Sequence, residues 1–174
     1  MRKITVASFI FVLLISTGLK TPGEDTNAKI KAVFLYNFTK YIEWPTNYKE
    51  GTFIIGIYGN NFPLTTELSK MASSKTMGKQ KFEIKSFSTL DNLDKCHMLF
   101  IPSETGCSFS ELTSKLKGKS TLIITEKPGL AKQGSAINFV IKDNKQKFEL
   151  NRANAEKYNL KVSSNLASLA IVVE

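Results

Sequence analysis

The residues that could carry chemistry in this chain are few and far apart. His97 is the only histidine, and it follows Cys96 at the start of an apolar run that predicts a strand. Neighbouring residues of a strand point to opposite faces, so this pair cannot readily share a metal ion. A structural zinc site needs four ligands, and a catalytic one needs three. We therefore expect His97 to be a structural residue and expect no metal site.

Cys96 and Cys107 are the two cysteines. If Cys96 begins the strand His97–Ile101 and Cys107 lies beyond its far end, the strand separates them by roughly 16 Å. A disulfide needs Cα atoms within about 7 Å, so it forms only if the loop folds back along the strand. Two free thiols, with Cys96 buried, are favoured, and a disulfide between Cys96 and Cys107 remains the alternative. The same separation argues against a Cys107–His97 catalytic dyad.

Signatures of catalysis and of cofactor binding are missing from the sequence. No G-x-S-x-G nucleophile elbow is present. The glycines of Gly56–Gly59 lack the third glycine and the downstream acid of a dinucleotide site. Four glutamates occur singly near the ends of predicted elements: Glu43, Glu104, Glu126 and Glu149. No two of them have a spacing that suggests the acid and the base of one catalytic site. We expect no enzyme, no catalytic residue and no cofactor.

The formal net charge of +9 invites a nucleic-acid partner. The lysines are scattered, however, and no aromatic residues alternate with them in the way that supports stacking on bases. We therefore expect no nucleic-acid binding. A basic face that meets an acidic protein or an anionic membrane surface, and an ordinary solvated surface, both stay open.

The first residues predict export. Arg2 and Lys3 precede an uncharged apolar run, and the small residues Ser16–Gly18 offer a cleavage site. This pattern is typical of a secretory signal peptide, and the run is too short for a membrane span. We expect residues 1–18 to be the signal peptide and 19–27 a flexible leader. The mature protein would then be periplasmic and would not insert into the membrane.

Residues Ala28–Pro45 predict a helix that is apolar on two sides. One face carries Ile30, Val33, Phe34, Asn37, Phe38 and Tyr41, and a second strip carries Ala32, Leu35, Tyr36 and Ile42. Pro45 should end the helix, because proline lacks an amide N–H and disfavours helical geometry in the residue before it. One sheet face is too narrow to cover both strips, so we predict a homodimer.

The rest of the chain predicts one α/β domain. Apolar or alternating runs indicate strands at Thr52–Tyr58, Lys81–Phe87, His97–Ile101 and Thr121–Thr125, with short helices from Asn61 and from Ser110. An antiparallel hairpin follows at Ser135–Asn151, turning at Asp143-Asn144, and then helices at Arg152–Tyr158 and Ser164–Val172. We expect a layered sandwich of Rossmann-like arrangement, with a mostly parallel sheet, helices on both faces and an antiparallel C-terminal hairpin.

Three stretches carry a resemblance to a known family. They are AKIKAVFLYNFTKYIEWP at 28–45, KCHMLFI at 95–101 and KPGLAKQGSAINFVIKDNKQKFELNRANAEKYNLKVSS at 127–164. Together and in this order they resemble the YfiR-like family of exported proteins, DUF4154, so that 28–174 would be a YfiR-like domain. The resemblance implies a regulator that docks on the periplasmic part of a membrane diguanylate cyclase and represses it. Such a protein would affect cyclic-di-GMP signalling and biofilm formation.

The alternative is a small-molecule-sensing module that serves a sensor kinase, since related domains occur fused to such kinases. In an open α/β sheet its pocket would lie beyond the carboxyl ends of the parallel strands. Those ends fall near Gly59–Phe62, Pro102–Gly106 and Thr125–Gly129.

Two sets of residues are candidates for a role in the site or in its support. Leu35, Tyr36, Trp44 and Arg152 are candidates for contact with a partner, with Arg152 facing an anionic group. For Trp44, at a helix-to-strand corner, packing in the core is favoured and an interface anchor is the alternative. Structural roles are expected for Asn37, Pro45, Asn138, Glu149 and Asn151. Asn37 should pin the first helix to a strand end or loop. Asn138, Glu149 and Asn151 match family positions and should satisfy backbone groups, with Asn151 capping the next helix.

Overall fold

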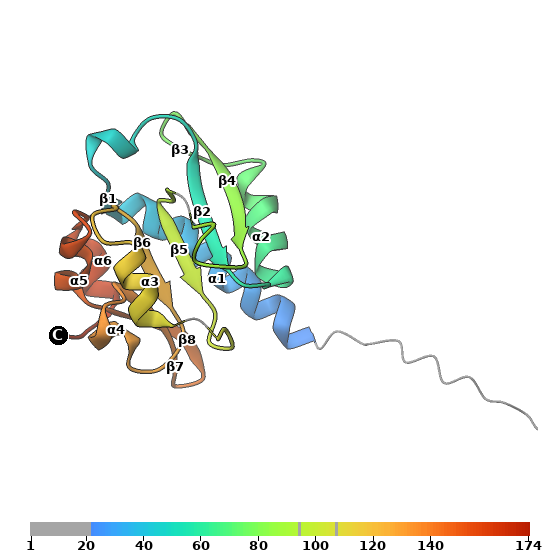
Figure 1. The fold of residues 1–174 in the computed structure, drawn as a ribbon. Coiled ribbons are helices and arrows are strands. Elements are labelled where there is room, and N and C mark those ends of the chain that lie inside the picture. Colours follow the sequence, from blue (N-terminus) through green and yellow to red (C-terminus); the bar gives the residue numbers. More distant parts are fainter. Residues whose placement is uncertain (1–21, 94, 107) are drawn as a thin grey trace, which may run out of the picture.

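The computed structural model describes residues 22–93, 95–106 and 108–174, which form a single α/β domain (Figure 1). Its centre is a curled sheet in the order β10-β8-β7-β6-β5-β2-β4-β3. The strands are β2 (Phe53–Tyr58), β3 (Thr76–Met77), β4 (Gln80–Phe87), β5 (Met98–Ile101), β6 (Leu122–Thr125), β7 (Ile137–Lys142), β8 (Lys145–Leu150) and β10 (Ile171–Val172). All neighbours pair in parallel except β7–β8 and β3–β4. The predicted fold class is confirmed.

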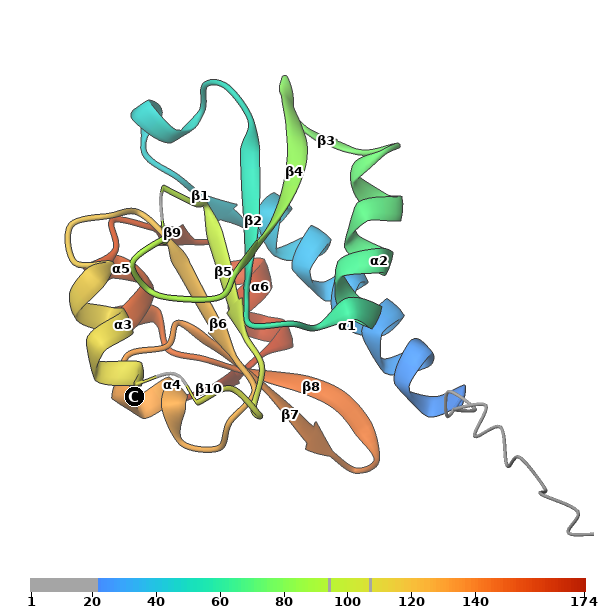
Figure 2. The same cartoon turned by 45° about the vertical axis from the view of Figure 1, so that its right-hand side comes forward.

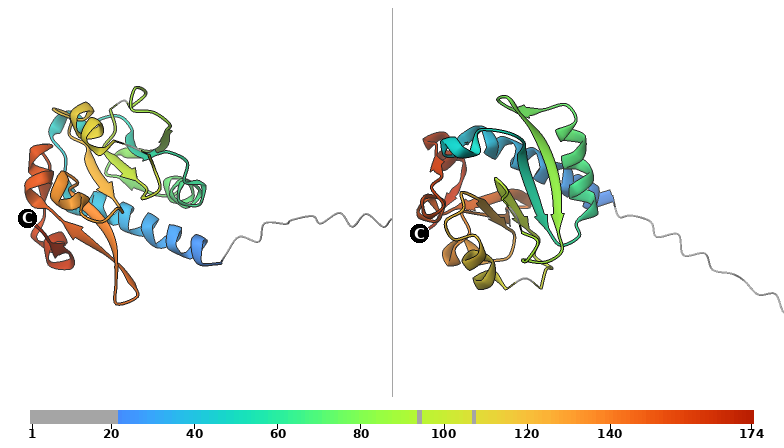
Figure 3. Two further views of the ribbon diagram at one scale, coloured as in Figure 1. Left: turned by 60° about the horizontal axis from the view of Figure 1, so that its bottom comes forward. Right: turned by 45° about the horizontal axis from the view of Figure 1, so that its top comes forward.

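Helices cover both faces of this sheet, as Figures 2 and 3 show. They are α1 (Pro22–Tyr41), α2 (Phe62–Ala72), α3 (Phe109–Lys115), α4 (Leu130–Gln133), α5 (Arg152–Lys157) and α6 (Ser164–Leu169), with a short 3-10 helix at Thr46–Tyr48. Helix α1 runs along one face with α2 beside it, and α3 lies on the opposite face (Figure 3). The strands β5 and β6 lie between these layers, which is why all their residues are buried and all but Thr125 are apolar.

The hairpin β7–β8 is confirmed, and its turn explains its register. Asp143 and Asn144 both have positive φ, 54° and 55°. This is the geometry of the two-residue turn that matches strand twist, and Asn and Asp tolerate it. Phe139 and Phe148 therefore become partners across the hairpin. Together they present an aromatic surface to α1.

Helix α1 differs from its prediction at both ends. It begins at Pro22, so residues 22–27 are helical and not a flexible leader; proline is well suited to the first turn of a helix. It ends at Tyr41, before the Trp44–Pro45 boundary, because β1 (Ile42–Glu43) leaves it to pair with β9 (Lys161–Val162). The expected signal peptide lies outside the described residues.

Aromatic packing holds α1 on the sheet. The ring of Phe34 lies 5.8 Å from the rings of both Phe139 and Phe148, measured between centroids. Phe38 lies 5.1 Å from Phe148, and its side chain is buried. Edge-on contacts at these distances stabilise a core beyond the burial of apolar area alone. Ile30 and Val33 lie on another side of the helix and stay 40% and 55% exposed.

The end of the chain is only partly predicted. Ser164–Val172 is not one helix: α6 stops at Leu169, and Ile171–Val172 form β10 in parallel with the end of β8. The branched residues Ile and Val favour a strand, but the pairing partner lies more than twenty residues earlier in the chain. Sequence periodicity could not supply that long-range contact.

Gly56 in β2 gives a direct test of this packing. A Cβ at this position would lie 2.7 Å from Cε2 of Phe87 and 3.0 Å from Cδ1 of Leu99. Both neighbours are buried and have little room to move. We expect Gly56→Ala to lower the free energy of unfolding by about 1–3 kcal/mol, measured by urea denaturation.

Gly106→Ala is the matched control, because no atom lies within 4 Å of a Cβ there. It should change the free energy of unfolding by less than about 0.5 kcal/mol. Equal stability of the two variants would contradict the close packing of β2 between β4 and β5.

Candidate functional site

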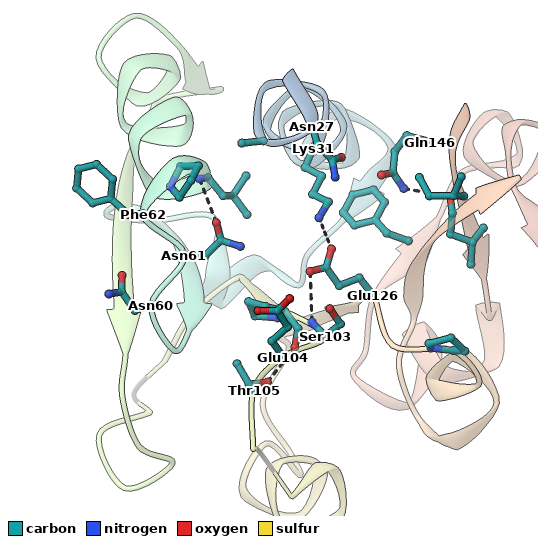
Figure 4. Close-up of a pocket in the computed structure, with 18 residues that line it drawn as sticks. Asn27, Lys31, Asn60, Asn61, Phe62, Ser103, Glu104, Thr105, Glu126 and Gln146 are labelled. Atoms are coloured by element: carbon teal, nitrogen blue, oxygen red, sulfur yellow. Dashed lines mark hydrogen bonds and ion pairs between the residues drawn. The ribbon is translucent and has the colours of Figure 1, made fainter. Parts of the chain in front are cut away.

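A cavity of about 960 Å³ lies at the carboxyl ends of β2, β5 and β6, below the first turns of α1 (Figure 4). Its walls come from α1, from the loops after the three strands and from the β7–β8 hairpin. The residues that follow the strands are Asn60–Leu64, which include the start of α2, Pro102–Thr105, Glu126 and Pro128. These are the segments at which the sequence predicts a pocket, so the predicted location is confirmed. Parallel strands bring separate loops together at this edge.

An ion pair occupies the middle of the cavity. Lys31 from α1 donates to Oε2 of Glu126, which directly follows β6 (Figure 4). The backbone N–H of Ser103 donates to the other carboxylate oxygen of Glu126 at 3.3 Å. The two side chains are only 13% and 14% exposed, so water screens their attraction poorly. The pair fastens α1 to the carboxyl edge of the sheet.

Apolar side chains frame the cavity mouth. Phe62, at the start of α2, and Ile141, on the hairpin, are each 65% exposed. Asn61 accepts the N–H of Leu64 at 3.2 Å and so caps α2, as the sequence predicts. This cap fixes where Phe62 begins the helix. The cavity thus combines a charged centre with an apolar rim.

The residues that line this cavity offer both charged and apolar contacts to a ligand. Among the described residues, no group of three or more His, Cys, Asp or Glu side chains could hold a metal ion. Lys31 and Glu126 form an ion pair with one another. The cavity can therefore hold and orient a ligand by charge and apolar contact.

His97 lies at the opposite, amino edge of the sheet and is structural, as predicted. Its Nδ1 accepts the N–H of Ile54 at 3.0 Å, and its Nε2 donates to the carbonyl of Tyr48 at 2.8 Å. The ring stacks on Phe53 at 4.3 Å between centroids, and the carbonyl of His97 accepts from Trp44 Nε1. Because Nδ1 must accept, the imidazole is neutral in this structure.

Cys96 is a buried free thiol, as expected. Burial raises its pKa to about 12, against the weaker opposing effects of Thr121 and of the Lys119 charge. A thiol that stays protonated is a poor nucleophile. Cys107 lies outside the described residues, so the disulfide question is not tested.

Two of the expected partner-binding residues are inside the protein. Leu35 is fully buried, and Trp44 is 2% exposed. Leu35 falls on the side of α1 that faces the sheet, and Trp44 turns inward to reach the carbonyl of His97 at 3.1 Å. Their burial argues against direct contact of either side chain with a partner, and for Trp44 the favoured prediction of core packing is confirmed. Both belong to the core.

The other two expected partner-binding residues, Tyr36 and Arg152, remain accessible to solvent. Tyr36 is half-buried against Phe82, and the Lys40 ammonium lies 4.3 Å from the centroid of its ring. Arg152 is exposed at the start of α5, and its Nη2 donates to the carbonyl of Val162 at 3.4 Å. A guanidinium has five donors, so this contact leaves most of them for another group.

Asn37 and Pro45 differ in how well their roles were predicted. Asn37 is half-buried and accepts from Lys40 Nζ at 3.0 Å, within α1 and not at a strand end or loop. Pro45 lies between β1 and the 3-10 helix, where its carbonyl accepts the N–H of Tyr48 at 2.9 Å. It redirects the chain after β1.

The three hairpin residues satisfy buried polar groups. Asn138 is buried, accepts from Thr125 Oγ1 at 2.7 Å and donates to Glu149 Oε2 at 2.9 Å. Asn151 caps α5 by accepting the N–H of Asn154 at 3.0 Å, which confirms the predicted cap. Ser135 links the two sets, because its hydroxyl accepts from Thr125 and its carbonyl accepts from Asn154, so β6, β7, β8 and the start of α5 share one network.

Sequence reasoning missed the Lys31–Glu126 pair. A signal was present: Lys31 interrupts an apolar helix, and Glu126 directly follows a buried strand. A charge at such a position needs a partner. The partner is 95 residues away, and only the topology of the sheet brings it close.

The domain is an α/β fold with a ligand-sized cavity at the carboxyl edge of its sheet. The YfiR/HmsC-like family model matches residues 28–171, most of the chain, and the protein belongs to this family. This is a regulatory family of exported proteins that act in cyclic-di-GMP signalling. A comparison with curated proteins finds no match. Within the described residues, no helix is long and apolar enough to span a membrane.

The neutral state of His97 makes stability depend on pH. Burial lowers the pKa of His97 below its usual 6.5, and the Lys95 charge adds to this against the opposing hydrogen bond to Tyr48. Below about pH 6.5 the unfolded chain takes up a proton that the folded chain resists. The free energy of unfolding should therefore fall between pH 7 and 5, by at most about 1.4 kcal/mol per pH unit.

Urea denaturation at pH 7, 6 and 5 measures this slope. His97→Gln removes the only imidazole of the chain. We expect the variant to be less stable at pH 7, because bonds to Ile54 and Tyr48 are lost, and to show a flatter pH profile. An unchanged slope in the variant would contradict the assignment to His97.

Proposed function

We propose that the protein is a periplasmic regulatory binding protein that docks on the extracytoplasmic part of a membrane signalling protein of the diguanylate cyclase type. By docking it represses that enzyme and thereby lowers cyclic-di-GMP and affects biofilm formation. The observation that carries this proposal is the family match over residues 28–171. The protein acts on the partner's conformation and not on the nucleotide.

Exposed side chains at one sheet edge support a docking surface. We define it by Arg152, Leu169 and Val172, all of which are exposed. Strand β10 pairs Val172 with Leu150, and Arg152 begins the helix that follows Leu150. An arginine beside apolar side chains is typical of protein interfaces. The expected partner is an extracytoplasmic domain with an anionic group beside an apolar patch.

Repression requires that the protein bind one conformation of its partner better than the other. Shifting that equilibrium a hundredfold needs about 2.7 kcal/mol of differential affinity. A single well-packed anchor at an interface supplies energy of this size. One anchor of this kind in the proposed surface would therefore be enough to shift the partner's equilibrium a hundredfold.

Crosslinking in the native host, followed by recovery of the protein from the periplasm, tests docking. We expect a membrane cyclase to be recovered through its extracytoplasmic domain. Arg152→Ala should reduce its recovery by about tenfold, because a charge-assisted hydrogen bond is lost.

The matched control is Lys132→Ala, which removes an exposed charge from α4. It should leave recovery unchanged. Equal loss in both variants would indicate nonspecific electrostatic attraction, and recovery of no membrane signalling protein would contradict docking.

A homodimer is part of this proposal. Ile30 and Val33 are exposed apolar residues three positions apart on α1, so they lie on the same side of the helix. Packing them against a second copy would remove them from water. We expect sedimentation to give a dimer at micromolar concentrations and Val33→Glu to give a folded monomer. A wild-type monomer at high micromolar concentration would contradict the dimer.

A second candidate function is supported by the cavity of about 960 Å³. Its position at the carboxyl ends of the parallel strands is where α/β domains commonly bind small molecules. In that case the protein would be a small-molecule-sensing module serving a sensor kinase.

A further inference from the structure

The volume of the cavity between α1, the strand ends and the hairpin bounds the size of a ligand that fits inside it. Its volume of about 960 Å³ lies near the upper end of the roughly 300–1,000 Å³ that small-molecule sites have. A single amino acid would leave much of this space to water. A molecule with two or three such units would reach from the charged centre to the rim.

Lys31 and Glu126 retain capacity for further hydrogen bonds. The ammonium has three donors, and one of them reaches Glu126. The carboxylate has about four acceptor positions, of which Lys31 and the N–H of Ser103 are seen to use two. Both side chains line the cavity. A ligand can therefore add to this ion pair without separating it.

The opposite charges of Lys31 and Glu126 determine which charges a ligand can carry at this site. An anion attracted by Lys31 meets repulsion from Glu126, and a cation attracted by Glu126 meets repulsion from Lys31. The mostly buried position of the pair makes both effects stronger than they would be at a surface. A molecule with one ammonium and one carboxylate, laid antiparallel to the pair, meets attraction at both ends.

Apolar contacts are available on either side of these charges. Phe62, at the start of α2, lies at the outer rim of the cavity, with Asn61 between it and the Lys31–Glu126 pair (Figure 4). Ile141 comes from the β7–β8 hairpin, and it and Phe62 are both 65% exposed. A ligand with apolar groups would cover both side chains and gain the free energy of removing them from water.

We propose that this cavity binds a small zwitterion with an apolar body, of the size of a dipeptide or tripeptide. Its carboxylate lies beside Lys31, its ammonium beside Glu126, and its apolar groups contact Phe62 and Ile141. The inference rests on the sensing candidate and deepens it. It needs no docking partner, so it stands or falls separately from the crosslinking result.

Calorimetric titration of the purified protein tests the charge requirement. The probes are leucyl-phenylalanine, its N-acetyl derivative and its C-terminal amide, which differ in charge and little in shape. We expect the free dipeptide to bind and each singly charged derivative to bind at least about tenfold more weakly, because one charge-assisted contact is lost. Equal affinities, or no binding of the dipeptide at millimolar concentration, would overturn the proposal.

Variants locate the site. Glu126→Gln and Lys31→Met should each weaken binding of the dipeptide at least about tenfold. Glu67→Gln is the control, because it breaks the exposed Lys70–Glu67 pair on α2 away from the cavity, and it should leave affinity unchanged. Unaltered binding by both cavity variants would overturn the assignment. Circular dichroism shows whether each variant folds. If either variant does not fold, the binding of the three probes to the wild-type protein still tests the charge requirement.

Discussion

Helix α1 must bury an aromatic side against the sheet, and the rest of the structure depends on that requirement. Phe34 and Phe38 meet the ring pair formed by Phe139 and Phe148, which the tight hairpin turn sets opposite one another. Once this side is fixed, helical geometry fixes the others. Lys31 then reaches the carboxyl edge of the sheet, while Ile30 and Val33 face away from the core. One packing contact thus places both the cavity and an exposed apolar strip.

The two edges of the sheet differ in how their polar side chains are bonded. At the amino edge, the neutral imidazole of His97 joins Ile54 and Tyr48 and stacks on Phe53, so polar groups are used up within the fold. At the carboxyl edge, Lys31 and Glu126 hold each other but keep hydrogen-bonding capacity toward a cavity. Polar groups that are bonded within the fold make the amino edge rigid, whereas polar groups that face the cavity at the carboxyl edge can bind a ligand.

Local sequence predicts what local interactions determine. The buried strands, the β7–β8 hairpin and the caps at Asn61 and Asn151 follow from apolar runs, turn residues and side chains three positions apart. Strand β10, the β1–β9 pair and the Lys31–Glu126 contact each need a partner far along the chain. The corner position of Trp44 predicts its place in the core, but not its hydrogen-bond partner, the carbonyl of His97, which is 53 residues away.

The most direct test of the central claim is the amount of cyclic-di-GMP in the native host, compared between cells with the intact gene, cells lacking it and complemented cells. A repressor of a membrane cyclase predicts a rise of several-fold on deletion and a return to the starting level on complementation with the exported protein. Complementation with a form kept in the cytoplasm should have no effect. An unchanged level on deletion, or rescue by the cytoplasmic form, would contradict repression from the periplasm.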